Sequence, residues 1–294
     1  MYLTGIADEA GALIDAQIKA TQELGWRTIE MRAVEVNGFP KANLHDLPDE
    51  AFEIVARKLE AAGLGVCCFG STIMNWAKTV DTPWDLTLGE VARAIPRMRR
   101  LGTKFVRIMS FKPADEAVVI PAAVFGRVRE VTQRFLDVGL QPVHENCMNH
   151  GGMSWQHALD LLEKAPGLRW VFDTANPIFN ADRSRAKPWP RQDPWEFWTH
   201  VRDFTEHIHI KDCVWNPAKN DADYTWPGEG DGRVKDILRD AFARGYDAGI
   251  SIEPHLAVVF HDASVTASAE AQHDSWVEYG RRLTALIDEV RSPA

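Results

Sequence analysis

The hexapeptide His-Ile-His-Ile-Lys-Asp at residues 207–212 combines the alternation of a strand with a cluster of ionisable side chains. Side chains alternate between the two faces of a strand, so His207, His209 and Lys211 share one face while the isoleucines are buried behind them. Burying two imidazoles, an ammonium and a carboxylate costs free energy, which is hard to explain in a strand that serves only to pack the core. The segment therefore predicts a strand that ends at a functional site.

Three other predicted strands also end on an acidic residue. These residues are Glu145, Asp173 and Glu253, and each follows a short apolar run. Three carboxylates within a few ångström repel one another unless a cation or protons neutralise them. Together with His209 they form an oxygen-rich set that suits Mn²⁺, Mg²⁺ or Co²⁺ better than thiolate-bound zinc. Each residue alone could simply cap a loop or form an ion pair, but four on successive strands favour a metal site.

A unit of helical segment, glycine and short apolar strand recurs along the chain. Gly25, Gly63, Gly102 and Gly139 each follow a helical pattern, at intervals of 37 to 39 residues. Glycine is favoured just after a helix because it adopts the left-handed conformation there. The predicted strands cover residues 3–7, 28–31, 66–69, 105–108, 142–144, 170–172, 206–212 and 249–252.

Eight strands that alternate with helices predict an α/β fold, a (β/α)₈ TIM barrel with a closed parallel sheet. The helical patterns cover residues 11–24, 48–62, 86–101, 117–138, 154–165, 194–204, 232–244 and 271–291. A doubly wound open sheet is the alternative, but no GxGxxG motif follows the first strand. We expect a single domain over residues 1–294. The long connections after strands, at 71–85, 174–193, 213–231 and 254–270, lie on the C-terminal rim, where function is expected.

Composition argues against several classes of protein. The 294 residues are 45% hydrophobic and 26% charged, as in soluble globular proteins. The net charge of −9, without a basic block, argues against a nucleic-acid partner. The first nine residues do not resemble a signal peptide, and no stretch approaches the roughly 20 apolar residues of a membrane span. Four cysteines show no CxxC spacing. We expect a cytoplasmic protein without membrane contact.

Motifs between residues 140 and 255 resemble those of the xylose-isomerase-like TIM-barrel superfamily of sugar isomerases and epimerases. That superfamily includes ketose 3-epimerases, hydroxypyruvate isomerase and inosose dehydratase. The resemblance implies that Glu145, Asp173, His209 and Glu253 are metal ligands, that the two glutamates are the catalytic acid/base pair, and that the protein is a homodimer or homotetramer. The matching motifs are 144–146 (HEN), 172–176 (FDTAN), 209–212 (HIKD), 227–232 (PGEGDG), 245–247 (GYD) and 251–254 (SIEP).

The predicted chemistry is isomerisation or epimerisation of an unphosphorylated keto-sugar or related polyol through an enediolate. A divalent metal, Mn²⁺ first and Mg²⁺ or Co²⁺ as alternatives, would polarise the carbonyl. Glu145 and Glu253 would supply base and acid from opposite sides of the sugar. The glycine loop at 227–232 precedes a helix, but its acidic residues would repel a phosphate.

Five further side chains are expected to bind substrate: His144, Asn176, Lys211, Arg107 and Glu229. His144 has the opposite parity to Glu145, so it could instead form a hydrogen bond behind the sheet. Asn176 stands where ketose epimerases often carry a substrate-binding histidine. Arg107, like Glu30, could instead form an ion pair inside the barrel.

Aromatic and imidazole side chains on the rim have two interpretations. Trp189, Trp195, Trp215 and Trp226 could stack on a sugar, or they could pack the long loops. Single rim histidines more often fix a loop than bind a ligand, and three lie on rim loops: His150, His255 and His261.

Three other functions are compatible with parts of this sequence. A metal-dependent lyase or dehydratase on a keto-sugar or keto-glycoside would use the same enolate and expel a β-substituent. An endonuclease-IV-like repair enzyme shares the barrel but needs more histidines and a basic face. A catalytically inactive sugar-binding protein would bind its ligand without metal dependence.

Overall fold

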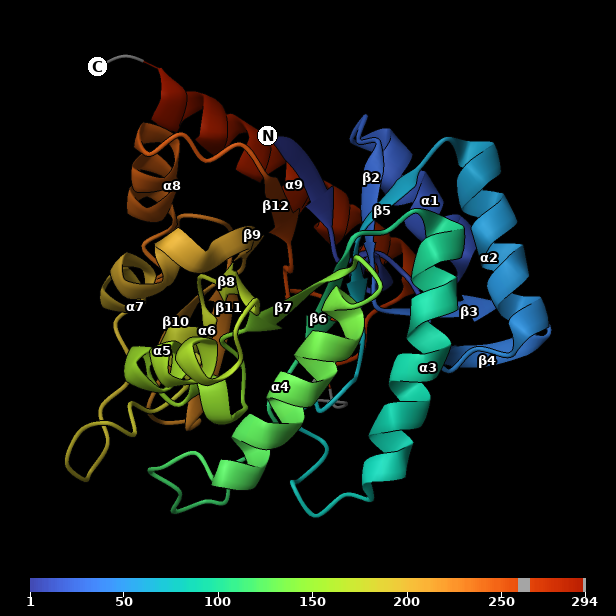
Figure 1. Cartoon of the computed structure of the whole chain (residues 1–294). Coiled ribbons are helices and arrows are strands. Elements are labelled where there is room, and N and C mark those ends of the chain that lie inside the picture. Colours follow the sequence, from blue (N-terminus) through green and yellow to red (C-terminus); the bar gives the residue numbers. More distant parts are fainter. Residues whose placement is uncertain (259–264, 293–294) are drawn as a thin grey trace.

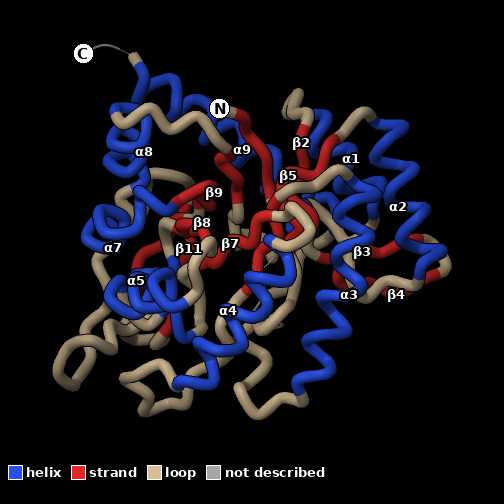
Figure 2. Tube along the Cα trace, viewed as in Figure 1, coloured by secondary structure: helices blue, strands red, loops and turns tan. Residues whose placement is uncertain are grey.

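A computed structural model describes residues 1–258 and 265–292, in which eight parallel strands form a nearly closed barrel. The order around the sheet is β1-β12-β9-β8-β7-β6-β5-β2, and helices surround the strands (Figures 1 and 2). The predicted TIM barrel is therefore confirmed. The strands are β1 (Tyr2–Gly5), β2 (Thr28–Met31), β5 (Gly65–Gly70), β6 (Phe105–Ile108), β7 (Gln141–Glu145), β8 (Arg169–Asp173), β9 (Thr205–Ile210) and β12 (Gly249–Ile252).

The barrel closes between β1 and β2 through contacts that are not a full ladder. Ile6 forms an isolated parallel bridge with Glu30. The Thr4 hydroxyl donates to the Thr28 carbonyl at 3.0 Å, and the Thr28 hydroxyl donates to the Leu3 carbonyl at 3.3 Å. Side-chain hydrogen bonds thus complete the ring where backbone pairing is sparse.

Each predicted helical segment forms a helix, and glycines end several of them. Gly63 and Gly102 adopt the left-handed conformation after α2 and α3, at φ of 66° and 68°. In this conformation backbone N–H groups at the helix end form hydrogen bonds to carbonyls of the last turn. Among the described helices, none is both long and apolar enough to span a bilayer. The main helices are α1 (Ile14–Glu23), α2 (Asp49–Ala62), α3 (Trp84–Leu101), α4 (Ala122–Leu136), α5 (Trp155–Lys164), α7 (Pro194–Val201), α8 (Val234–Ala243) and α9 (Ala269–Arg291).

Strand residues alternate between the helix layer and the barrel interior. Trp170 and Phe172 of β8 and Ile208 of β9 belong to the large core beneath the helices. Val143 and Val171 belong to a separate small cluster inside the barrel. This alternation directs the next inward residues of the strands toward the C-terminal mouth.

The C-terminal rim carries structure that the sequence patterns do not predict. Two antiparallel hairpins and one short helix follow β2, β9 and β8, respectively (Figure 1). The strand predicted to reach residue 212 ends at Ile210, because Asp212 begins a hairpin. The predicted connection 254–270 lies partly outside the described residues, as does His261. The added elements are β3 (Ala33–Val36), β4 (Phe39–Asn43), α6 (Asn176–Phe179), β10 (Asp212–Asn216) and β11 (Asp221–Thr225), with 3₁₀ turns η1 (Ala7–Glu9), η2 (His150–Gly152) and η3 (Arg202–Phe204).

Asp212 fixes the glycine loop at 227–232. Its buried carboxylate accepts backbone hydrogen bonds from Gly228, Gly230 and Gly232 at 2.8, 3.0 and 2.9 Å, and from Cys213 at 3.0 Å. A Cβ at Gly230 would lie 2.6 Å from the Cys213 carbonyl oxygen, so only glycine fits. Asp212 therefore has a structural role in shaping this part of the rim.

Replacing Asp212 with alanine is expected to lower the free energy of unfolding by about 2–4 kcal/mol, because several backbone donors lose their acceptor together. Urea denaturation monitored by tryptophan fluorescence measures the change. Asp231→Ala, an exposed acid on the same loop, is the control and is expected to change stability by less than about 0.5 kcal/mol. Equal losses in both variants would rule out the clamping role of Asp212.

Candidate active site and metal centre

Four predicted ligands meet at the C-terminal mouth of the barrel. Glu145, Asp173, His209 and Glu253 come from β7, β8, β9 and the end of β12, which are neighbours in the sheet. One ligand atom from each lies within 4.8 Å of those of the other three, and all four residues are buried. The sheet register pairs Asp173 directly with His209. The strands thus bring together three carboxylates and one imidazole.

His209 is oriented as a metal ligand. Its Nε2 lies 3.1 Å from Glu30 Oε1, behind the site. Its buried Nδ1 has no hydrogen-bond partner among the described residues and lies 3.6 Å from Glu145 Oε1 and 3.8 Å from Glu253 Oε2. An imidazole that donates from one nitrogen to a carboxylate presents the lone pair of the other nitrogen to a metal. The donor set therefore fits a divalent cation.

The charge balance of the mouth points the same way. Burial of Asp173, opposed by Lys211 and reinforced by Glu253 and Glu145, raises its pKa to about 7. A buried carboxyl group keeps its proton toward neutrality unless nearby positive charge compensates the ionised form. A bound divalent cation would replace that proton and stabilise the ionised form.

His209 responds to the same negative charge in the opposite direction. Burial lowers its pKa, but Glu30 and then Glu145 outweigh burial and raise the pKa to about 10. In the absence of another cation, the imidazole therefore holds a proton that a metal would displace.

Glu30 lies in the layer behind the ligands and not in the substrate pocket. Its carboxylate contacts His209 and also lies 2.9 Å from Nε2 of His207. Glu30 therefore forms a buried ion pair inside the barrel, which was one of the two roles considered for it from the sequence. His207 and His209 therefore have different roles. His207 contacts Glu30 behind the site, and His209 is a candidate metal ligand.

Replacing Glu30 with glutamine is expected to weaken metal binding by about 10- to 100-fold, because the carboxylate sets the orientation and basicity of His209. Titration calorimetry with Mn²⁺ measures the affinity. Glu130→Gln is the control, at a partly exposed position on α4 where Glu130 pairs with Arg134. An unchanged affinity in Glu30→Gln would exclude this supporting role.

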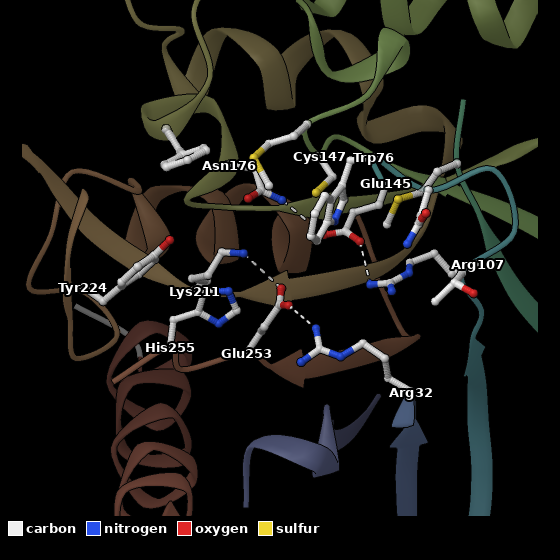
Figure 3. Close-up of a pocket in the computed structure, with 15 residues that line it drawn as sticks. Arg32, Trp76, Arg107, Glu145, Cys147, Asn176, Lys211, Tyr224, Glu253 and His255 are labelled. Carbon is white, nitrogen blue, oxygen red and sulfur yellow. Dashed lines mark hydrogen bonds and ion pairs between the residues drawn. The ribbon is translucent and has the colours of Figure 1, made fainter. Parts of the chain in front are cut away.

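Positive side chains hold the two candidate catalytic glutamates. Arg107 Nη1 lies 2.8 Å from Glu145 Oε2, and Arg32 Nη1 lies 2.8 Å from Glu253 Oε1 (Figure 3). Lys211 Nζ bridges Glu253 Oε2 at 3.0 Å and Asp173 Oδ2 at 3.1 Å.

These cations determine the protonation of both glutamates. Burial alone would raise the pKa of Glu145, but Arg107 and then His209 outweigh it and lower the pKa to about 2. Burial is likewise outweighed at Glu253 by Lys211 and other positive groups, which hold its pKa well below the usual range. Both glutamates are therefore ionised at neutral pH and able to accept a proton.

A pocket opens onto this cluster. Glu145 and Glu253 both line it, with three of the predicted substrate-binding residues: Lys211, Arg107 and Asn176. Asn176 Nδ2 donates to Glu145 Oε1 at 3.1 Å, and its backbone N–H donates to Asp173 Oδ1 at 2.7 Å. Asn176 thus links a pocket glutamate to the carboxylate at the end of β8.

Two predicted substrate contacts lie away from this pocket. His144 points into the helix layer, where its Nε2 lies 3.0 Å from the Ser110 hydroxyl and its ring stacks on Trp170 at 4.9 Å. Glu229 is exposed and forms a surface ion pair with Arg282 at 3.2 Å. The structure therefore brings neither side chain to the pocket.

The pocket residues that were not predicted as substrate contacts include Arg32, Trp76, Tyr224 and His255. Arg32 directly follows β2, so its position after a strand was a usable signal. His255 receives two contacts from Glu9, at 2.9 Å to its backbone N–H and 2.9 Å to Nδ1, and it has a φ of +53°. Trp76 and Tyr224 come from rim segments where no sequence pattern distinguishes them.

The rim tryptophans and His150 pack or fix the loops of the rim. None of the four rim tryptophans considered above lines the pocket; for example, Arg191 covers Trp215 at 3.3 Å and Arg282 covers Trp226 at 4.2 Å. His150 Nδ1 donates to the Ser110 carbonyl at 2.7 Å and fixes its loop.

The structure is similar to several solved structures whose descriptions differ. One is a xylose isomerase-like TIM barrel protein from Mycobacterium smegmatis in complex with magnesium, at 18% identity and a TM-score of 0.65, covering 98% of this chain and 97% of that one. Another is the probable 3-DHS dehydratase AsbF involved in petrobactin synthesis from Bacillus anthracis, at 15% identity and a TM-score of 0.69, covering 97% and 99%. A third is a D-tagatose 3-epimerase-like protein, at 14% identity and a TM-score of 0.70, covering 99% and 98%.

At these identities the likeness establishes the fold alone. A search of curated proteins finds no significant match. A family model described as "Xylose isomerase-like TIM barrel" matches residues 18–291, nearly the whole chain. Together with the eight-stranded barrel, this match shows that the chain belongs to the xylose isomerase-like TIM barrel family.

Proposed function

We propose that this protein is a divalent-metal-dependent isomerase or epimerase of an unphosphorylated keto-sugar or related polyol. The observation that carries the proposal is the convergence of Glu145, Asp173, His209 and Glu253 within 4.8 Å beneath a pocket that both glutamates line. The magnesium in the Mycobacterium smegmatis protein and the likeness to an epimerase-like structure support it.

The same four residues would hold the metal, and Mn²⁺ is the expected ion because the set is rich in carboxylate oxygens. When bound, the cation supplies Lewis-acid polarisation of the substrate carbonyl and stabilises the negative charge of the enediolate. Asp173 Oδ1 is already held by the backbone N–H groups of Ala175 and Asn176, which leaves Oδ2 directed into the cluster near Lys211.

Proton transfer is assigned to the two glutamates. Glu145 and Glu253 lie on strands separated by β8 and β9, and both reach the same pocket. One removes the proton next to the carbonyl while the other returns a proton, and the roles exchange when the reaction runs in reverse. Arg107 and Arg32 keep the two carboxylates ionised and in place.

The pocket suits the uncharged part of a sugar. Each of its three cations, Arg32, Arg107 and Lys211, is paired with a carboxylate, so no cation there is dedicated to a phosphate. Trp76 lines the pocket and offers an aromatic surface for sugar C–H groups. Lys211 and Asn176 provide hydrogen-bond donors for hydroxyl or enolate oxygens.

Metal analysis followed by proton exchange in D₂O tests the proposal. The purified protein is expected to contain or bind one divalent ion per chain, and the loaded protein is expected to wash deuterium into the carbon next to the carbonyl of a keto-sugar. Accumulation of an unsaturated product would identify the lyase alternative, which uses the same enolate. Exchange that is unaffected by complete metal removal, or no exchange with any keto-sugar, would reject the proposed function.

A further inference from the structure

A second cleft adjoins the candidate active site. It shares Met148 and Phe179 with the first pocket, so these two residues form a common wall. A substrate that extends beyond the reacting carbons past this wall would therefore enter the second cleft. The cleft is built from the loops after β6, β7 and β8.

Positive side chains dominate this cleft. Lys112, Arg183 and Arg191 line it, whereas Asp115 is its one acidic lining residue in the described chain. None of the three cations forms an ion pair with a carboxylate among the residues described. The protein carries 42 acidic and 33 basic residues, so three cations without an acidic partner in one cleft are unusual.

Both arginines are held in place by their surroundings. Arg183 Nη1 donates to the carbonyls of Ala114 and Ala117 at 2.7 and 3.0 Å, and its guanidinium lies 5.1 Å from the Trp189 ring. A guanidinium offers five N–H donors in a rigid fork, and these bonds use one nitrogen. The remaining donors are available to a ligand at little cost in side-chain entropy.

Arg191 is held in the same manner. Its Nη1 donates to the Phe179 carbonyl at 2.5 Å, and its guanidinium stacks on Trp215 at 3.3 Å. Burial lowers the pKa of Arg191 and of Arg183, and only Asp115 opposes that effect at Arg183. Positive charge in the cleft is thus incompletely compensated by the protein itself.

An unused amide donor points to the same ligand chemistry. Asn180 lines the cleft, and its Nδ2 is buried without a hydrogen-bond partner among the described residues. Buried donors in folded proteins normally have an acceptor. The polar residues of the cleft therefore include one amide donor whose hydrogen-bonding capacity is unused among the described residues.

We propose that this cleft is a subsite for a carboxylate, and that the substrate is an acidic keto-sugar or keto-glycoside whose charged end lies between Arg183 and Arg191. This inference rests on the proposed function, which places the reacting carbons in the first pocket. The planar guanidinium groups of Arg183 and Arg191 match the geometry of a carboxylate.

Three sugars that differ only at C6 test the subsite. We would measure the binding of D-fructose, D-fructuronate and D-fructose 6-phosphate to the metal-loaded protein by calorimetry, with deuterium exchange of each sugar in parallel. D-fructuronate is expected to bind at least about tenfold more tightly than D-fructose, since hydrogen bonds between charged groups are the strong ones. Tighter binding of the phosphate than of the carboxylate would overturn the assignment to a carboxylate.

In each variant we would compare the affinity for D-fructuronate with the affinity for D-fructose. A variant that folds poorly would bind both sugars less, so this ratio would not change for that reason. Arg183→Met and Arg191→Met are each expected to remove most of the preference for D-fructuronate, and Asp115→Asn is expected to increase it. Arg185→Met is the matched control, because Arg185 is exposed and already pairs with Asp182 and Glu196. It is expected to keep the preference.

The binding and exchange arms separate the two proposals. Exchange of all three sugars without a preference for the acid would refute the subsite and leave the proposed function intact. A preference that depends on both arginines, without exchange of any sugar, would support the subsite and reject the proposed function. Binding of none of the three sugars would refute the subsite.

Discussion

Replacing Glu145 or Glu253 with glutamine is expected to lower the rate of substrate deuterium exchange by about 10²- to 10⁴-fold, the usual contribution of a positioned acid or base. Glutamine keeps the shape of the side chain and a carbonyl oxygen for the metal, but it cannot accept the substrate proton. Both carboxylates are ionised at neutral pH, because Arg107 and Lys211 outweigh the effect of burial. Each therefore begins the cycle able to act as a base.

The two variants are expected to differ in which proton they fail to remove. If the glutamates serve opposite faces of an epimerase substrate, Glu145→Gln blocks exchange from one epimer and Glu253→Gln blocks exchange from the other. Exchange of each epimer in D₂O, measured by NMR, distinguishes these outcomes. Normal exchange from both epimers in either variant would remove that glutamate from the mechanism.

Controls must separate chemistry from metal binding and folding. Each glutamine variant leaves a buried arginine with a weakened partner, and breaking a buried ion pair costs about 3–5 kcal/mol. Thermal unfolding and metal content are therefore measured on the same samples, and rates are compared at full metal occupancy. Glu130→Gln on α4 is expected to match the unmodified protein in all three measurements.

The barrel and the convergence of four strand-end residues at its mouth were predictable because both follow from local rules. Alternation along a strand placed Asp173 and His209 on the inward face, and glycines after helices marked the repeating unit. In a barrel, residues at the ends of parallel strands meet at one mouth whatever their distance in sequence. The same alternation allowed His144 either to contact substrate or to face the helix layer. The structure places it in the helix layer, where its ring stacks on Trp170.

The walls of the pocket follow from tertiary contacts that no local pattern encodes. Glu229 lies in a glycine loop whose course is set by the carboxylate of Asp212, so its outward direction depends on a distant residue. Trp76 and Tyr224 reach the pocket from a long loop and an unpredicted hairpin. Arg32 is different, because a charged residue directly after β2 obeys the same rule that predicted the four candidate ligands.

Metal binding is expected to release a number of protons that depends on pH. In the metal-free protein Asp173 has a pKa of about 7 and His209 a pKa of about 10, and both residues must lose their protons to become ligands. Near pH ~8.5, Asp173 is already ionised, so binding releases about one proton, from His209. Near pH ~5.5, both residues are protonated and binding releases about two. Metal affinity therefore falls more steeply with acidification below the pKa of Asp173 than above it.

Asp173→Asn is expected to weaken metal binding by at least about 10³-fold. It is also expected to abolish the release of the second proton that accompanies metal binding at low pH. Removing one unit charge about 4 Å from a cation costs about 4 kcal/mol at an effective dielectric constant of about 20, and each 1.4 kcal/mol is a factor of about ten. Calorimetry of Mn²⁺ binding in two buffers of different ionisation enthalpy gives affinity and proton release together. Asp160→Asn, an exposed acid on α5, is the control. Equal proton release at both pH values in the unmodified protein, or near-normal affinity in Asp173→Asn, would show that Asp173 is not a ligand and that the carboxylates at the mouth serve only to pair with Lys211 and the arginines.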